Sequence, residues 1–298
     1  MKFKNIVFVL ILRMNTFSHA KELETLIEPT EIVSDLVSQY QLQEVDFDYI
    51  KQVINKGTRN SAKAILIDTR PESKYKKGTI PTSLNIPDTK FEEYYSVLDG
   101  LAKDTELIVF CEGYNCTKSA IVAQKLKEKE HSNVKVYLAG EPQWNKYSYL
   151  EIDTSTIKSY QERNSALLVD ARAYAKYLEE TIPGAISIPD LNINKLMGRF
   201  PIDKKEDIVI FCEDYTCGKA NNIANRLISL DYENVYVYAG GLLLWKESGL
   251  DTIVSTKANI EDKKEKKEQS PKKERQFKSK MNTKNNESNT NDAWYKKN

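Results

Sequence analysis

Phe110–Ala120 reads FCEGYNCTKSA, and Phe211–Ala220 reads FCEDYTCGKA. In both stretches an apolar run ends on a cysteine, a second cysteine follows five residues later, and a lysine opens a helix-like pattern. All four cysteines of the protein lie in these two loops, with the same spacing. The repetition of one strand–cysteine–loop–helix unit indicates a duplicated domain in which the cysteine loop has a chemical role.

The sequence around the cysteine loops repeats as well, with an offset of 102 residues in the first half of each copy and 101 residues in the second half. The matched segments, first copy and then second, are the strands 64–67 and 166–169, the Asp-x-Arg tripeptides 68–70 and 170–172, the segments 75–88 and 177–190, the strands 107–110 and 208–211, and the segments 133–140 and 234–240. Short apolar strands alternate with helix patterns in both copies. This alternation predicts parallel βα crossovers and an α/β sheet covered by helices on both faces.

The charge is unevenly distributed along a chain of 298 residues, a length that suits about two domains. Residues 257–298 carry a net charge of +6 and residues 1–20 carry +3, so a total of +1 leaves −8 for residues 21–256. The body of the protein is therefore acidic, which argues against nucleic acid as its main partner.

Residues 1–20 have the pattern of a secretory signal peptide. Two lysines precede the apolar run Ile6–Leu12, and Ser18-His19-Ala20 has the small residues of a cleavage site. A run of seven residues is too short for a bilayer, which requires about 20. We therefore expect export, to the periplasm or an equivalent compartment, after cleavage near Ala20. A buried N-terminal strand is the alternative interpretation.

The segments that flank the two copies are polar. Residues 21–42 form a mildly helical lead-in. Residues 257–298 are rich in Lys, Glu, Asn and Ser, a composition that buries too little apolar surface to fold, so we expect a disordered tail. Its basic charge suits contact with an anionic surface, and a solvated tail without a specific role is the alternative.

Each copy contains one ordered series: Asp-x-Arg after a strand, a Thr-Ile-Pro segment that ends in Ile-Pro, the cysteine loop, and an Asn-Val-x-Val-Tyr strand followed by a tryptophan. This series resembles a rhodanese (sulfurtransferase) domain, over residues 43–150 and again over 151–256. The resemblance implies two tandem three-layer α/β/α domains, each with a mostly parallel sheet. It also implies a cysteine that accepts sulfane sulfur as a persulfide, without a cofactor, and passes it to a thiophilic acceptor.

The family's nucleophile lies where the strand ends, which places it on Cys111 and Cys212. Loop N–H groups and a helix N-terminus follow each of them, and such a setting lowers a thiol pKa from about 8.5 into the range of about 3.5–7.5. A buried, inert cysteine is the alternative. We expect Cys212 to be the more active, because its half keeps Pro183-Gly184-Ala185 and Gly240-Gly241, which are nearer to the family pattern.

Glu112 and Glu213, directly after the two nucleophiles, depart from the family, in which arginine is common at this position. A carboxylate there raises the pKa of the thiol and repels anionic thiosulfate. Lys118 and Lys219 are the only nearby cations that the sequence offers to offset this charge, and solvated lysines are the alternative reading. The remaining candidates for binding or supporting roles are the Asp-x-Arg pairs and one loop tyrosine in each copy: Asp68, Arg70, Asp170, Arg172, Tyr114 and Tyr215.

The second cysteines, Cys116 and Cys217, have several possible roles. Each could resolve a persulfide, form a disulfide with the first cysteine of its own loop, or serve the structure only. Zinc is disfavoured, because each pair belongs to a separate domain and no histidine lies nearby. The sequence therefore predicts no metal site.

These observations favour a sulfurtransferase with a small sulfur donor, such as thiosulfate or polysulfide, and a thiol or protein acceptor. Two alternatives remain. One is a non-catalytic rhodanese-like scaffold, which the glutamate beside each cysteine favours. The other is a dithiol/disulfide redox protein, which the paired cysteines favour. Neither the donor, the acceptor nor the oligomeric state is predicted.

Overall fold

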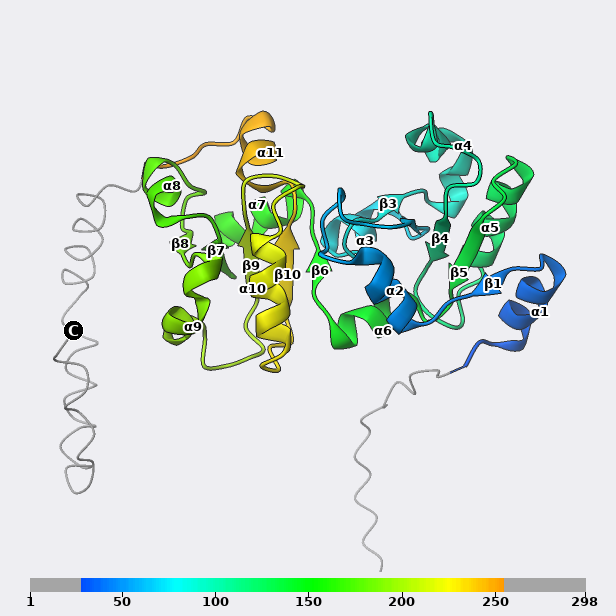
Figure 1. Cartoon of the computed structure of the whole chain (residues 1–298), viewed down its shortest axis with the longest axis horizontal. Coiled ribbons are helices and arrows are strands. Elements are labelled where there is room, and N and C mark those ends of the chain that lie inside the picture. The colour runs from blue at the N-terminus through cyan, green and yellow to red at the C-terminus, as the bar shows by residue number, and fades with distance from the viewer. Residues whose placement is uncertain (1–27, 255–298) are drawn as a thin grey trace, which may run out of the picture.

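The computed structural model describes residues 28–254, which form two α/β domains side by side (Figure 1). Within these residues each domain contains one sheet of five strands, in the orders β1-β5-β4-β2-β3 and β6-β10-β9-β7-β8. All strand pairs of the two sheets are parallel, which confirms the predicted fold class. The strands are β1 (Gln43–Glu44), β2 (Ile65–Asp68), β3 (Leu84–Asn85), β4 (Leu107–Phe110), β5 (Val134–Tyr137), β6 (Leu150–Glu151), β7 (Leu167–Asp170), β8 (Ile186–Ser187), β9 (Ile208–Phe211) and β10 (Val235–Tyr238).

Helices cover both faces of each sheet. In the first domain α1, α4 and α5 pack on one face, and α2 and α6 pack on the other. In the second domain α9 and α10 face α7 and α11 across the sheet in the same way. The helices are α1 (Glu31–Gln39), α2 (Phe47–Ile54), α3 (Glu72–Lys77), α4 (Phe91–Tyr94), α5 (Lys118–Glu128), α6 (Gly140–Tyr147), α7 (Thr154–Arg163), α8 (Tyr174–Glu179), α9 (Ile193–Leu196), α10 (Lys219–Ile228) and α11 (Gly241–Glu247). Short 3-10 turns lie at Asp88–Lys90, Tyr95–Leu98, Asp190–Asn192 and Met197–Arg199.

The central strands β4 and β9 explain where the cysteines lie. Their sequences, LIVF and IVIF, are apolar without interruption, and all of their side chains are buried. A strand buried on both faces needs such a continuous run, whereas a half-exposed strand alternates. Each run ends at the carboxyl edge of its sheet, directly before the first cysteine of the loop.

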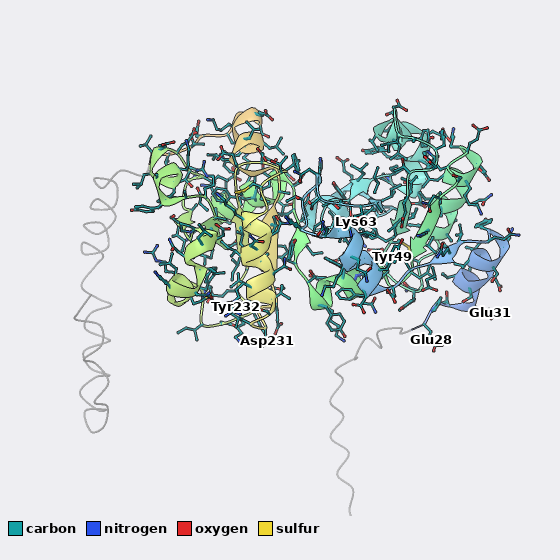
Figure 2. The ribbon with its side chains drawn as sticks, in the orientation of Figure 1. Glu28, Glu31, Tyr49, Lys63, Asp231 and Tyr232 are labelled. Atoms are coloured by element: carbon teal, nitrogen blue, oxygen red, sulfur yellow. A yellow bond between two sulfur atoms is a disulfide. The ribbon has the colours of Figure 1, made fainter. Side chains whose placement is uncertain are left out.

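The polar lead-in belongs in part to the first domain, which the sequence did not predict. Val33 of α1 and Leu42 are buried in the core beside α5. The N–H of Thr30 donates to the carbonyl of Tyr114 in the first cysteine loop, at 3.1 Å. Glu28 and Glu31 lie at the end of this domain that is distant from the second domain (Figure 2).

The predicted signal peptide and the predicted disordered tail lie outside the described residues. Between residues 28 and 254 no helix has the length and apolar character needed to cross a membrane.

The connection between helix and central sheet is longer in the first domain, from α2 to β2, than in the second, from α7 to β7, and it contacts the second domain. Ten residues, 55–64, separate α2 from β2, whereas three residues separate α7 from β7. We call residues 55–64 the bridging segment, because it reaches the second domain: Nδ2 of Asn221, on α10, donates to the carbonyl of Gly57 at 2.8 Å. The same amide donates to the hydroxyl of Tyr149 at 2.9 Å.

Asn221→Ala should destabilise the junction between the domains. The substitution removes both hydrogen bonds and leaves a carbonyl and a hydroxyl unpaired in a buried site, a loss of about 1–3 kcal/mol in the free energy of unfolding. Asn222→Ala is the matched control, because this neighbouring side chain is exposed and makes one contact of 3.5 Å with Asp190. Chemical denaturation measures both variants. An equal effect of the two substitutions would show that Asn221 does not hold the junction.

Candidate functional site

The first cysteine of each loop lies at the carboxyl end of the central strand of its sheet. Cys111 follows β4 and Cys212 follows β9, and their exposed fractions are 1% and 2%. Parallel α/β sheets bind ligands at this edge, outside the carboxyl ends of the strands. Both candidate nucleophiles therefore occupy the same place in the fold.

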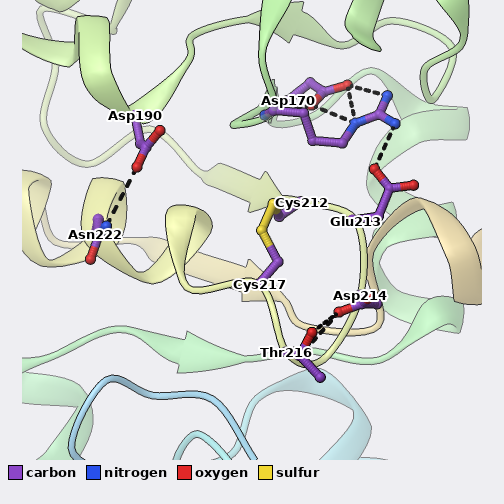
Figure 3. The surroundings of a disulfide bond; sticks show 9 residues. Asp170, Asp190, Cys212, Glu213, Asp214, Thr216, Cys217 and Asn222 are labelled. Atoms are coloured by element: carbon purple, nitrogen blue, oxygen red, sulfur yellow. Dashed lines mark hydrogen bonds and ion pairs between the residues drawn. A yellow bond between two sulfur atoms is a disulfide. The ribbon is translucent and has the colours of Figure 1, made fainter. Parts of the chain in front are cut away.

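Each first cysteine is bonded to the second cysteine of its loop. The disulfides join Cys111 to Cys116 and Cys212 to Cys217, with Cα–Cα distances of 6.2 and 6.1 Å. These distances lie within the usual range for disulfides, about 4.4–6.8 Å. Figure 3 shows the second of these bonds. Cys116 and Cys217 are half-buried, so the second cysteine is the more exposed residue of each pair. Of the roles that the sequence left open for them, the structure contains the disulfide.

A glycine packs against the carbonyl of each strand-end cysteine. Gly241 begins α11 with a φ of +60°, and a Cβ built there would lie 2.6 Å from the carbonyl oxygen of Cys212. Gly140 has a φ of +62° and would collide with the carbonyl of Cys111 in the same way. The N–H of Leu242 then donates to the carbonyl of Cys212 at 3.0 Å. Only glycine fits here, because the site requires both a positive φ and the absence of a Cβ.

Both Asp-x-Arg motifs form buried ion pairs beside the cysteine loops. Nη2 of Arg70 lies 2.7 Å from Oδ2 of Asp68, and Nη2 of Arg172 lies 2.9 Å from Oδ2 of Asp170. Burial acts to lower the pKa of Arg172, but the hydrogen bond to Asp170 and the charges of Asp170 and Glu213 outweigh it, so that its pKa is raised. The same balance raises the pKa of Arg70. Both guanidinium groups therefore remain fixed positive charges.

The glutamates beside the cysteines are themselves paired with cations. Nη1 of Arg172 lies 3.2 Å from Oε2 of Glu213 (Figure 3). Glu112 forms an ion pair with Lys74 of α3. The negative charge next to each candidate nucleophile is therefore offset within the fold.

The prediction that Lys118 and Lys219 are the only nearby cations is wrong. Nζ of Lys118 lies 3.7 Å from Oδ1 of Asp88, and Lys219 is exposed at the start of α10. The sequence missed Arg172 and Lys74 in this role because the chain brings them to the loops across the sheet edge, from the segments that follow β7 and β2.

Arg59 of the bridging segment is a further residue that the sequence did not indicate. Its guanidinium lies 3.8 Å from the ring centroid of Tyr215, in the second cysteine loop. Nη2 of Arg59 also lies 3.8 Å from Oε1 of Glu151. Glu151 is buried, with an exposed fraction of 6%. Burial raises the pKa of Glu151, against the opposing effects of Arg59 and of the N–H of Thr82. The unequal spacing between helix and strand in the two copies was the only sequence signal for this contact.

Tyr114 occupies the position in the first loop that Tyr215 has in the second. Its ring packs partly against both core clusters of the first domain, and partial burial raises the pKa of its hydroxyl. Within residues 28–254 no cation lies over this ring. Each cysteine loop thus contains a disulfide, but the loops differ at their tyrosines. Arg59 covers the ring of Tyr215, and no cation of residues 28–254 covers the ring of Tyr114.

The arrangement can carry out two kinds of sulfur chemistry. With the disulfides present, an external thiolate can attack the sulfur of Cys116 or Cys217, which belongs to the more exposed residue of each pair. With the disulfides reduced, a thiol lies at the end of each central strand, before loop N–H groups that can hold an anion.

Comparison with known proteins gives one family. The model of the rhodanese-like domain matches residues 48–147 and 153–248. An uncharacterized protein of Synechocystis sp. is 28% identical over 109 residues, which cover 37% of this chain and 59% of that protein. The tRNA uridine(34) hydroxylase of Bdellovibrio bacteriovorus is 34% identical over 83 residues, which cover 27% of this chain and 23% of that protein. The chain thus matches less than two thirds of the length of either relative.

Solved structures with a similar arrangement include two bacterial proteins. The thiosulfate sulfurtransferase of Pseudomonas aeruginosa is 18% identical, with a TM-score of 0.32, over 72% of this chain and 44% of that chain. A protein of Bacillus halodurans is 26% identical, with a TM-score of 0.34, over 38% of this chain and 82% of that chain.

Gly241→Ala should destabilise the second domain more than an alanine at another glycine with a positive φ. The positive φ alone costs about 1–2 kcal/mol, and the collision with the carbonyl of Cys212 adds about 1–3 kcal/mol. Gly249→Ala is the control, since Gly249 has a φ of +71° and a Cβ at this position would have no atom within 4 Å. Denaturant unfolding of both variants gives the difference, and equal losses would refute the role of the close approach.

Proposed function

Because the chain belongs to the rhodanese-like family and contains two copies of its domain, we propose that it transfers sulfane sulfur through a cysteine persulfide. The single observation that carries the proposal is the position of Cys111 and Cys212. Both follow the central strand of a parallel sheet and precede a loop and a helix. Cys212 is the proposed principal nucleophile.

The first step is reduction of the disulfide. An external dithiol gives up two electrons and two protons, becomes a disulfide itself, and leaves Cys212 and Cys217 as thiols. Without this step neither sulfur is available as a nucleophile.

Sulfur transfer then takes two displacements. The Cys212 thiolate attacks the outer sulfur of a donor such as thiosulfate; the bond between the two donor sulfurs breaks, and sulfite leaves with the electron pair. An acceptor thiolate attacks the outer sulfur of the resulting persulfide, takes that sulfur as its own persulfide, and releases the Cys212 thiolate. A polysulfide donor reacts in the same way, with a shorter polysulfide as the leaving group.

The ion pair of Glu213 reduces the repulsion of an anionic donor. The carboxylate beside the nucleophile would raise the thiol pKa and repel thiosulfate if it were alone. Arg172 lies 3.2 Å from this carboxylate and is also paired with Asp170, so a buried cation offsets part of the negative charge beside the nucleophile. The same pairing weakens the ground for a non-catalytic scaffold, which rested on an unopposed glutamate.

A dithiol/disulfide redox protein is the second candidate function. The two intraloop disulfides favour it, since the pairs need no sulfur donor to cycle between thiol and disulfide. An exported location suits both candidates, because disulfides persist in oxidising compartments. We propose the exported location as well. For the transferase we propose a small-molecule sulfur donor and a thiol or protein acceptor.

Intact mass after reduction and treatment with thiosulfate tests the transferase. The reduced protein should gain one sulfur atom for each active domain, and Cys212→Ser should lose the gain of the second domain. Cys217→Ser is the matched control: it keeps the nucleophile, and its persulfide should last longer, because no neighbouring thiolate can displace hydrosulfide from it. The unreduced protein should gain nothing.

Two results would contradict the proposal. If the reduced protein gains no sulfur but its disulfides cycle with a protein dithiol, the redox function is correct. If the double variant Cys111→Ser/Cys212→Ser gains as much sulfur as the parent, the nucleophiles are assigned wrongly.

A further inference from the structure

The two domains contain equivalent grooves beside their cysteine loops. The register of the edge strands defines the equivalence: Glu44 of β1 pairs with Val136, and Glu151 of β6 pairs with Val237. The first-domain groove is lined by Glu44, Asp46, Asp48, Tyr114, Tyr137 and Gln143, among others. The second-domain groove is lined by Glu151, Asp153, Tyr215 and Tyr238, at the matching positions, together with residues of the first domain.

The matching extends to the hydrogen bonds of the groove. Asp46 caps α2 by accepting from the N–H of Tyr49, at 2.9 Å. Asp153 caps α7 by accepting from the N–H of Thr156, at 3.0 Å. Both grooves therefore present a strand-end glutamate, a capping aspartate and a loop tyrosine in one arrangement.

The chain itself fills the second-domain groove. Arg59 places its guanidinium 3.8 Å from the centroid of the Tyr215 ring and 3.8 Å from Oε1 of Glu151. Tyr75 and Thr79 of the first domain also line this groove. What remains is a cavity of about 190 Å³, and Glu151 is buried.

The first-domain groove is open. Its volume is about 430 Å³, and Glu44 is exposed. Among residues 28–254 no cation pairs with Glu44 or stacks on Tyr114. The nearby Lys135 is engaged elsewhere: its Nζ lies 2.6 Å from the hydroxyl of Tyr49 and 3.1 Å from Oε1 of Glu106.

We propose that the first-domain groove is a docking site for a partner protein that presents an arginine-bearing loop. The partner's guanidinium stacks on Tyr114 and pairs with Glu44, as Arg59 does with Tyr215 and Glu151. The charge supports this occupant, since Glu44, Asp46 and Asp48 line the groove, and a cation over an aromatic ring is attracted to its face. The docking does not depend on sulfur transfer.

The partner would cover the first cysteine loop. Tyr114 lies two positions before Cys116, the half-buried sulfur of the first disulfide. A docked loop therefore places a second protein next to the Cys111–Cys116 pair, whereas the bridging segment already occupies the corresponding place at Cys212.

The test uses a peptide with the sequence of residues 55–63 of the bridging segment, Asn-Lys-Gly-Thr-Arg-Asn-Ser-Ala-Lys, added to the full chain. Amide chemical shifts of residues 44–48 and 112–117 should change on binding, while those of the second-domain groove should not. A peptide with glutamine in place of the arginine should bind at least about fivefold more weakly. Glu44→Gln and Tyr114→Leu in the protein should weaken binding of the arginine peptide to a similar degree.

Glu247→Gln is the control for loss of surface charge, because Glu247 is exposed on α11 in the other domain, and it should leave binding unchanged. Thermal unfolding shows whether each variant is folded. If Tyr114→Leu does not fold, the peptide binding of Glu44→Gln, a substitution at an exposed position, tests the proposal by itself. Equal binding of the two peptides, or the absence of shifts in the groove, would overturn the proposal.

Two other occupants would also overturn it. If the full chain forms a dimer that Glu44→Gln dissociates, a second copy fills the groove. If carbodiimide joins Glu44 to a lysine of residues 257–298 within one molecule, the chain's own terminal segment fills it.

Discussion

A buried arginine beside each cysteine loop is the interaction on which the rest of the site depends. Arg70 and Arg172 each bind the aspartate at the end of a strand, the carbonyl at the end of a helix, and a carboxylate next to the loop. An arginine in this position ties together three segments that the sheet alone would leave independent. Loss of one partner in such a buried pair costs about 3–5 kcal/mol, since an uncompensated charge remains.

The third partner of that arginine differs between the domains, and the difference follows from one substitution in the chain. In the second domain Arg172 binds Glu213, directly beside Cys212. In the first domain Arg70 binds Glu141, at 2.8 Å, and Glu112 turns to Lys74 instead. The second domain has Leu242 where the first has Glu141. Arg172 therefore has no carboxylate at this position and pairs with Glu213 of the cysteine loop. The electrostatic surroundings of the two strand-end cysteines, Cys111 and Cys212, therefore differ.

The fold and the place of the two strand-end cysteines could be predicted from the sequence, because both depend on local patterns. The runs LIVF and IVIF require a buried strand, and a cysteine at the end of such a strand must reach the carboxyl edge of the sheet. The cations at the loops could not be predicted, because Arg172 and Arg59 reach the second loop from segments distant in the chain. Proximity in sequence suggested that Lys118 and Lys219 are the cations that offset the glutamates. In the structure Lys118 forms an ion pair with Asp88, and Lys219 is exposed to solvent. Likewise, spacing permits a disulfide in each loop but does not distinguish it from a free pair. The predicted signal peptide, tail and export remain predictions.

The shortness of each disulfide loop has a consequence for how the protein oxidises as it matures. The bonded cysteines are five positions apart, whereas the two loops are separated by most of a domain. The entropy lost on closing a loop grows with its length, so an unfolded chain forms the two local bonds more readily than any bond between the loops. Correct pairing therefore does not require the docking of the domains. Oxidative maturation of this chain needs an oxidant but little reshuffling of mispaired thiols.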